Sequence, residues 1–96
     1  MAEIRLSPAA LADIEGIFDF RATTWGLAQA IEYSKAIEDT LVALLAHPES
    51  AANCSHIRTG YRRALAGRHF VYFRIESYGI AVIRILHPRM DATSHL

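Results

Sequence analysis

The sequence has a single cysteine, Cys54, and therefore cannot form an internal disulfide. This excludes a small secreted scaffold held by disulfides, and nothing indicates an oxidising compartment. Long apolar runs are also missing: the longest, LVALLA at residues 41–46, is far shorter than the roughly 20 residues that a membrane span needs. The first residues, MAEIRLSPAAL, have no basic segment followed by an apolar one, so no signal peptide is expected. We expect a cytoplasmic protein with no membrane partner.

Motifs that hold cofactors or metals are missing as well. The five glycines are scattered and form neither a dinucleotide-binding fingerprint nor a phosphate-binding loop. No two histidines lie four residues apart on a predicted helix, and one cysteine cannot make a cluster, so no metal site is expected. Only Glu76 and Asp91 supply carboxylates in the second half, which disfavours a paired-carboxylate hydrolase there. We expect no cofactor, and we interpret Cys54 as a buried or half-buried thiol.

Lysine is scarce, and nine of the ten basic residues are arginine. The formal net charge is zero, but residues 1–50 carry eight acids and three bases, whereas residues 51–96 carry two acids and seven arginines. The first half is therefore −5 and the second half +5. Because the planar guanidinium suits carboxylates and phosphates, the second half is suited to an anionic partner surface. The alternative is that it pairs with the acidic first half of the same chain.

Two helices are predicted in the first half. Ser7 and Pro8 are a typical N-cap and first helical residue, and Gly26 ends the first helix, which we place at residues 8–24. The second helix runs over residues 27–46 and ends before Pro48. The apolar stripes are Leu11, Ile14, Ile17 and Phe18, and then Ile31, Ile37, Leu41, Leu44 and Leu45. The helices form an antiparallel hairpin, with Trp25 packed in the core at the bend.

Strands are predicted on both sides of this hairpin. Residues 3–6 alternate briefly, and after a polar connector the apolar period falls to two in residues 61–66, 68–76 and 80–86. Short turns make the last three strands an antiparallel meander. The order β-α-α-β-β-β indicates an α+β fold, with an N-terminal strand and an antiparallel helical hairpin packed on an antiparallel sheet. One domain spanning residues 1–96 is expected.

The sheet face away from the helices is predicted to be a mixed aromatic and basic binding surface, because it carries Phe70, Tyr72 and Arg74. The second half also gathers Arg58, Tyr61, Arg62, Arg63, Arg68, His69, Arg84, His87, Arg89 and His95. Such a set binds a carboxylate-rich or phosphate-rich partner through charge-assisted hydrogen bonds. Alternatively it cleaves RNA, with arginine stabilising the phosphorane and histidine acting as acid and base. The residue types alone leave both possibilities open.

Arg84 lies inside an apolar strand, where it pairs with Glu76 or a helix carboxylate, or contacts a partner. Adjacent strand residues point to opposite faces, so at most one of Arg62 and Arg63 lines a given site. In the tail, Pro88 fixes where the chain leaves the strand, between His87 and Arg89. Asp91 caps the tail or pairs with Arg89, and Leu96 is expected to tuck onto the helices. We interpret the tail as an ordered, positively charged part of an interaction surface.

Five segments cover nearly the whole chain: LSPAALADIEGIFDF, WG, QAIEYSKAIEDTLVALLAHPE, IRTGYRRALAGRHFVYFRI and GIAVIRILHPRMDATSHL. Together they resemble the ParE toxins, the gyrase-directed branch of the ParE/RelE superfamily of bacterial toxin–antitoxin pairs. The most specific pieces are GYRR at residues 60–63, ILHPRMD at 85–91 and the final HL at 95–96.

The resemblance implies a non-enzymatic inhibitor that poisons DNA gyrase, so it implies no catalytic residue. It also implies a ParD-like antitoxin, whose ribbon-helix-helix dimer binds DNA and whose C-terminal segment wraps the toxin. Operator DNA would be reached only through that antitoxin. The residues expected to bind the antitoxin or gyrase are Arg58, Tyr61, Arg62, Arg63, His69, Arg84, His87, Arg89, Asp91 and Leu96.

The alternative within the superfamily is a RelE-like toxin, a ribosome-dependent mRNA endonuclease that uses basic residues on the sheet. Arg62, Arg89 and His95 match that residue set. However, Ala64 stands where a base is expected, and His69 stands where that branch often has arginine. The missing base and the ParE-type HPRMD segment favour the gyrase-directed branch.

Overall fold

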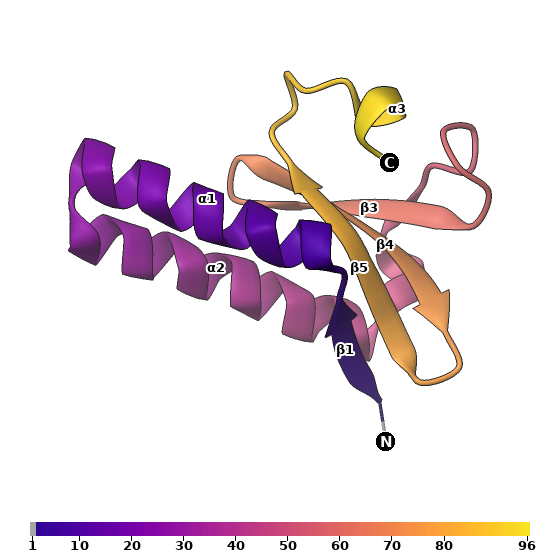
Figure 1. The fold of residues 1–96 in the computed structure, drawn as a ribbon. Helices are drawn as coiled ribbons and strands as arrows, with labels where there is room; N and C mark the ends of the chain where they lie inside the picture. The colour runs from indigo at the N-terminus through magenta and orange to yellow at the C-terminus, as the bar shows by residue number, and fades with distance from the viewer. Residues whose placement is uncertain (1) are drawn as a thin grey trace.

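The computed structural model describes residues 2–96 and confirms the α+β class (Figure 1). Two helices form a hairpin that covers one face of a five-stranded sheet, whose strand order is β1-β5-β4-β3-β2. The elements are β1 (Glu3–Leu6), α1 (Pro8–Trp25), α2 (Leu27–Ala46), a 3₁₀ turn (Pro48–Ser50), β2 (Ala52–Asn53), β3 (Tyr61–Ala66), β4 (His69–Glu76), β5 (Gly79–Leu86) and α3 (Ala92–His95).

The helical hairpin is bounded by the residues that the sequence marks. The Ser7 hydroxyl accepts a hydrogen bond from the Ala10 N–H at 2.9 Å and donates one to the Ile83 carbonyl at 2.6 Å, so the cap of α1 also ties the helix to β5. Gly26, with φ of 98°, separates α1 from α2 in a conformation that favours glycine. Helix α2 spans the residues predicted, and α1 extends one residue further, to Trp25.

The sheet is mixed, which corrects the prediction of a purely antiparallel sheet. Strands β3, β4 and β5 form the predicted antiparallel meander, but β1 pairs with β5 in parallel. Gly79 permits that pairing, because a Cβ there would collide with the backbone of Glu3. The connector also contains β2, which periodicity misses because a two-residue strand shows no alternation.

The inner face of the sheet, beneath the hairpin, holds the main apolar core. Val71, Phe73, Ile80 and Val82 are completely buried there, and α2 covers them with Ile37, Leu41 and Leu44. Two predicted core positions are wrong, since Leu11 and Ile31 are exposed on the outside of the hairpin. Among residues 2–96, neither long helix is apolar enough to cross a bilayer.

The outer face is covered as well, which corrects the prediction of an open aromatic and basic surface. Tyr72 is only 3% exposed and packs with Cys54 and Leu86. Leu96, in the C-terminal segment, packs on this cluster. The prediction that it packs on the helices is wrong. Burial raises the pKa of the Cys54 thiol, with nearby Arg63 and Arg62 opposing the shift, so Cys54 is the buried thiol expected from the sequence.

Candidate partner-binding surface

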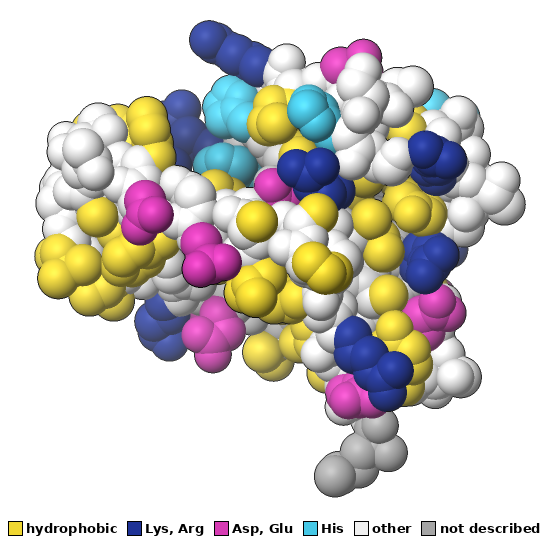
Figure 2. Space-filling model, viewed as in Figure 1, with side chains coloured by type: hydrophobic (Ala, Val, Ile, Leu, Met, Phe, Trp, Pro, Cys, Tyr) yellow, Lys and Arg dark blue, Asp and Glu magenta, His cyan; other side chains and the backbone are white. Residues whose placement is uncertain are grey.

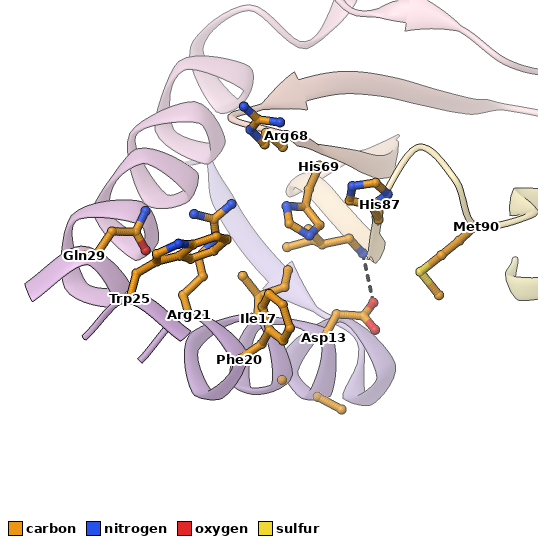
Figure 3. Close-up of a pocket in the computed structure, with 13 residues that line it drawn as sticks. Asp13, Ile17, Phe20, Arg21, Trp25, Gln29, Arg68, His69, His87 and Met90 are labelled. Carbon is orange, nitrogen blue, oxygen red and sulfur yellow. Dashed lines mark hydrogen bonds between the residues drawn. The ribbon is translucent and has the colours of Figure 1, made fainter. Parts of the chain in front are cut away.

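A cavity of about 880 Å³ lies between the hairpin and the sheet (Figure 3). Its walls come from α1, from the first residues of α2, from the β3–β4 turn and the start of β4, and from the end of β5 with the segment that follows it. The lining residues include Asp13, Ile17, Phe20, Arg21, Trp25, Gln29, Arg68, His69, His87 and Met90. Arg68, His69 and His87 lie toward the sheet, whereas Arg21 of α1 lies beside Trp25, and Ile17 and Phe20 extend the apolar side along α1 (Figure 3).

Tyr33 of α2 joins the groups on the cationic side. Its hydroxyl accepts the Arg68 backbone N–H at 2.7 Å and lies 2.6 Å from His69 Nδ1 and 3.3 Å from the Ala66 carbonyl. The one phenolic proton is donated to His69 or to Ala66, depending on the imidazole tautomer. Gly67 allows this close approach, because a Cβ at that turn would lie 2.6 Å from the Tyr33 ring. The β3–β4 turn is therefore fixed against α2.

Arg21 is a buried cation in this wall. It is 8% exposed, and its guanidinium lies 3.3 Å from the centre of the Tyr33 ring and 5.3 Å from that of Trp25. None of the ion pairs or side-chain hydrogen bonds within residues 2–96 involves its guanidinium. A desolvated cation is stabilised by aromatic faces, and its donors stay free for an acceptor that arrives from outside.

Two imidazoles complete the cationic side. The rings of His69 and His87 lie 5.6 Å apart in an edge-to-face arrangement. Burial of the imidazole and the nearby His87 and Arg21 lower the pKa of His69, while Asp13 acts in the opposite direction. His69 is therefore neutral near physiological pH in the isolated protein.

The opposite side of the cavity is apolar and exposed. Phe20 and Trp25 are 62% and 59% exposed and pack edge to face, with ring centres 5.9 Å apart. The prediction that Trp25 lies in the core is wrong, because the free end of the hairpin extends beyond the sheet (Figure 1). Exposed apolar side chains gather over that end of the hairpin (Figure 2), where Leu27 and Ile31 are also exposed. A patch of this kind indicates an interaction surface.

Six of the ten predicted site residues lie on the outer face of the sheet or in the C-terminal segment that covers it. Arg58 donates to the Leu96 carbonyl at 2.6 Å, and Arg84 donates to the His95 carbonyl at 3.1 Å. Asp91 accepts the Thr93 N–H and the Ser94 hydroxyl and so caps α3, which resolves its two predicted roles in favour of the cap. Tyr61, Arg63 and Leu96 pack at the same face. The tail is ordered, as predicted.

Arg84 pairs with a helix carboxylate, one of the alternatives left open by the sequence. Its Nε and Nη2 each donate to Asp13 of α1 at 2.8 Å, and Asp13 also accepts the Ile85 N–H at 2.9 Å. The strand pairing skips Ile83, so Val82 and Ile85 both face the core while Arg84 reaches α1. Of the four ion pairs among residues 2–96, only this one joins the acidic half to the basic half. Most charges of the acidic first half therefore form no ion pair with the basic second half in residues 2–96.

Arg62 and Arg63 point to opposite faces, as predicted. Arg62 donates to the carbonyls of Ala51 and Glu49 and so fixes the connector before β2. Arg63 lies 4.4 Å from the centre of the Phe70 ring on the outer face. Arg89 is exposed, and its backbone N–H donates to His87 Nδ1 at 3.2 Å. His69 and His87 are thus the two members of the predicted set that line the cavity, and partner contact by all ten remains a prediction.

Arg21, Tyr33 and Asp13 were not predicted from the sequence as site residues. A signal was present for two of them. Arg21 falls four residues after Ile17 and places a cation on the apolar stripe of α1, and Tyr33 falls four residues before Ile37 and extends the apolar stripe of α2. An arginine on such a stripe is rarely buried unless its charge has a partner. Within residues 2–96, no group of three or more His, Cys, Asp or Glu side chains is placed to hold a metal ion.

A family model described as "ParE toxin of type II toxin-antitoxin system, parDE" matches residues 4–92. The chain belongs to the ParE toxin family. Toxin ParE1 of Caulobacter vibrioides is 34% identical over 96 residues, which cover 100% of this chain and 99% of that toxin. Toxin ParE1 of Mycobacterium tuberculosis is 39% identical over 92 residues, which cover 95% of this chain and 94% of that toxin. The resemblance found in the sequence is confirmed.

Solved structures share the fold. A chain from the chromosomal ParDE toxin–antitoxin system of P. aeruginosa superposes with a TM-score of 0.78 at 20% identity, covering 91% of this chain and 96% of that one. A chain of the YoeB–YefM complex from Staphylococcus aureus gives 0.61 at 15% identity, covering 91% and 97%. In this ParE-family chain, the GYRR segment opens β3, and ILHPRMD leads from β5 past the cavity toward α3.

Proposed function

We propose that this chain is a growth-inhibiting toxin that binds DNA gyrase and poisons it without catalysing a reaction, and that a ParD-like antitoxin neutralises it. The observation that carries the proposal is the match to the ParE toxin family over residues 4–92. The partner-binding surface comprises the cavity and the exposed apolar end of the hairpin.

The antitoxin is a ribbon-helix-helix dimer whose C-terminal segment wraps the toxin, and operator DNA is contacted only through it. The neighbouring structure from P. aeruginosa is a ParDE system, which supports a partner of this kind. The exposed apolar side chains at the free end of the hairpin support it too, because Phe20, Trp25 and Leu27 lack cover within residues 2–96. A wrapping segment would bury them.

A non-catalytic mode of action is supported by the way the candidate nuclease residues are used. Arg62 is held by two backbone carbonyls, Ala64 offers no base, and the His95 carbonyl is bound by Arg84 in a structural contact. A general acid and base must both reach one scissile bond. The use of the Arg62 guanidinium in a structural contact and the missing base at position 64 therefore support a non-catalytic mode of action.

One observation favours a second candidate, a ribonuclease. His69 and His87 are adjacent in the cavity, with Arg21 and Arg68 in the same wall. Two imidazoles and a guanidinium are the groups that general acid–base cleavage of RNA needs. The cavity therefore supplies the residues to mutate in that case, in place of the set expected from the sequence.

The test is supercoiling of a relaxed plasmid by purified gyrase, with this protein in excess over the enzyme. We expect loss of supercoiled product and accumulation of cleaved DNA. Arg89→Ala, which alters an exposed residue of the C-terminal segment, should weaken inhibition, and Arg5→Ala, an exposed arginine on β1, is the matched control.

A ribosome-containing translation extract with labelled mRNA is the parallel experiment. Unchanged supercoiling together with mRNA cleavage would overturn the gyrase proposal. In that event His87→Gln should reduce cleavage by about 10²-fold or more, the contribution typical of a general acid or base.

A further inference from the structure

The cationic wall of the cavity has more donors than the protein itself uses. Arg21 and Arg68 lie near the same phenol ring, Arg21 against its face and the Arg68 backbone on its hydroxyl, with His69 and His87 beside them. Asp13 is the carboxylate that lines the cavity, and both of its oxygens already accept hydrogen bonds from Arg84. The wall therefore carries uncompensated positive charge.

Arg21 is the decisive member of this wall. Its side chain is more than nine-tenths buried, no carboxylate within residues 2–96 pairs with it, and it lines the cavity. A buried guanidinium is normally paired, because burial removes the water that solvates it. An oxyanion supplied from outside would give it the bidentate partner that guanidinium geometry suits.

We propose that the cavity is a carboxylate-binding subsite, in which an Asp or Glu of a partner segment binds Arg21, Arg68 and His87 while a neighbouring large apolar side chain packs on Phe20 and Trp25. This deepens the proposed antitoxin binding, on which it rests for the identity of the partner. A nucleic acid strand suits this part of the molecule less well, because the helices beside the cavity carry exposed acids outside its lining: Glu15, Asp19, Glu32, Glu38 and Asp39. A single carboxylate on an apolar segment avoids repeated repulsion along that surface.

The chain contains one tryptophan, Trp25, which lines the cavity and reports its occupancy by fluorescence. The probes are acetyl-Leu-Glu-Leu-amide and its neutral counterpart acetyl-Leu-Gln-Leu-amide, titrated into the intact protein. We expect the Glu peptide to bind about tenfold more tightly, the usual gain from a charge-assisted hydrogen bond. Equal binding of the two peptides would overturn the proposal.

Two arginine variants locate the effect. Arg68→Ala changes an exposed turn residue of the cavity and should remove most of the Glu-over-Gln preference, whereas Arg5→Ala, exposed on β1 and outside the cavity lining, should keep it. Arg21→Met should abolish the preference, with circular dichroism checking the fold. If Arg21→Met does not fold, Arg68→Ala decides alone: an unchanged preference in that variant contradicts the proposal.

A third probe separates peptide from RNA. Uridylyl-3′,5′-uridine is titrated in the same way, and tighter binding of this dinucleotide than of the Glu peptide would overturn the peptide assignment in favour of a nucleic acid. The titrations need neither gyrase nor antitoxin. If the intact protein inhibits gyrase but binds the Glu and Gln peptides equally, the subsite is rejected and the gyrase target is kept. If it prefers the Glu peptide but does not inhibit gyrase, the gyrase target is rejected and the subsite is kept.

Discussion

The two faces of the sheet are covered in different ways. The hairpin covers the inner face with apolar side chains, and residues such as Phe73 and Ile80 are completely buried. The outer face is covered by a short C-terminal segment, and its core is the small cluster of Cys54, Tyr72 and Leu86. Consecutive strand residues serve opposite faces, so Tyr72 and Phe73 are both buried although they are neighbours in the chain.

This difference indicates that the inner face supplies most of the folding stability, whereas the cover of the outer face is more easily loosened. Apolar burial of the inner face scales with area and is not directional. The outer cover depends instead on a few directed contacts, in which Arg58 and Arg84 bind backbone carbonyls of the last two residues. Such a cover loosens when single polar contacts are removed, whereas the inner face does not.

The largest effect should come from the inner face. Phe73→Ala removes a ring that is 0% exposed and should lower the free energy of unfolding by about 3–5 kcal/mol. That is a large share of the roughly 5–15 kcal/mol typical of a domain. Urea denaturation followed by circular dichroism measures it. Phe20→Ala, at 62% exposure, is the control and should change stability by less than about 0.5 kcal/mol.

The ion pair that links α1 to β5 should rank second. Asp13→Asn leaves Arg84 without its carboxylate in a site where the two side chains are 13% and 21% exposed. We expect a loss of about 1–3 kcal/mol, less than for a fully buried pair. Glu15→Gln, an exposed acid on the same helix, is the matched variant. An equal loss in both variants would show that helix charge, and not the pair, is responsible.

The outer cover should give a smaller effect. Leu96→Ala removes a half-buried side chain from the Tyr72 cluster and should lower stability by about 1 kcal/mol. Hydrogen exchange of the Leu96 amide, which donates to the Ala92 carbonyl, should accelerate in parallel. Thr93→Ala, exposed in the same segment, should leave both unchanged. A loss as large as that of Phe73→Ala would contradict the contrast between the faces.

The smallest expected effect is the loss of folding stability at acidic pH that His69 causes. The pKa of His69 is lowered in the folded protein, chiefly by burial, so the unfolded chain binds a proton more readily. Neutral His69 contributes fully to the free energy of unfolding above the unfolded-state pKa of about 6.5. This contribution is lost as the pH falls below that value toward the lower pKa of the folded state. After burial, the nearby His87 and Arg21 also lower the pKa of His69, Asp13 acts in the opposite direction, and the Tyr33 hydroxyl lies 2.6 Å from His69 Nδ1. Stability should therefore decline on acidification below about pH 6.5, and His69→Gln should flatten that slope in thermal melts.

Local signals sufficed for much of the fold. Helix α2 begins after Gly26 and ends before Pro48, and both boundaries are visible within a few residues of sequence. The meander follows from a period of two and short turns. The parallel partner of β1 was not predictable, because Glu3 and Gly79 are separated by 75 intervening residues and their pairing depends on a collision that only glycine avoids.

The site was less predictable than the fold. The sequence marked His69 and His87 but gave no sign that they meet, since their proximity depends on the register of β4 against β5. It placed Trp25 in the core because large aromatic residues are usually well buried on average. The free end of the hairpin overrides that preference, since no strand lies beneath it (Figure 1).

The parallel pairing of β1 with β5 sets an order in time. Strand β1 is made first, but its partner, Gly79–Leu86, is made near the end of synthesis, as is the Arg84 that binds Asp13. At about 5–20 residues per second, the interval between the two strands is roughly 4–15 s. During those seconds the apolar stripes of the hairpin segments have no sheet to cover, so the main core of this toxin forms only after the last strand is made.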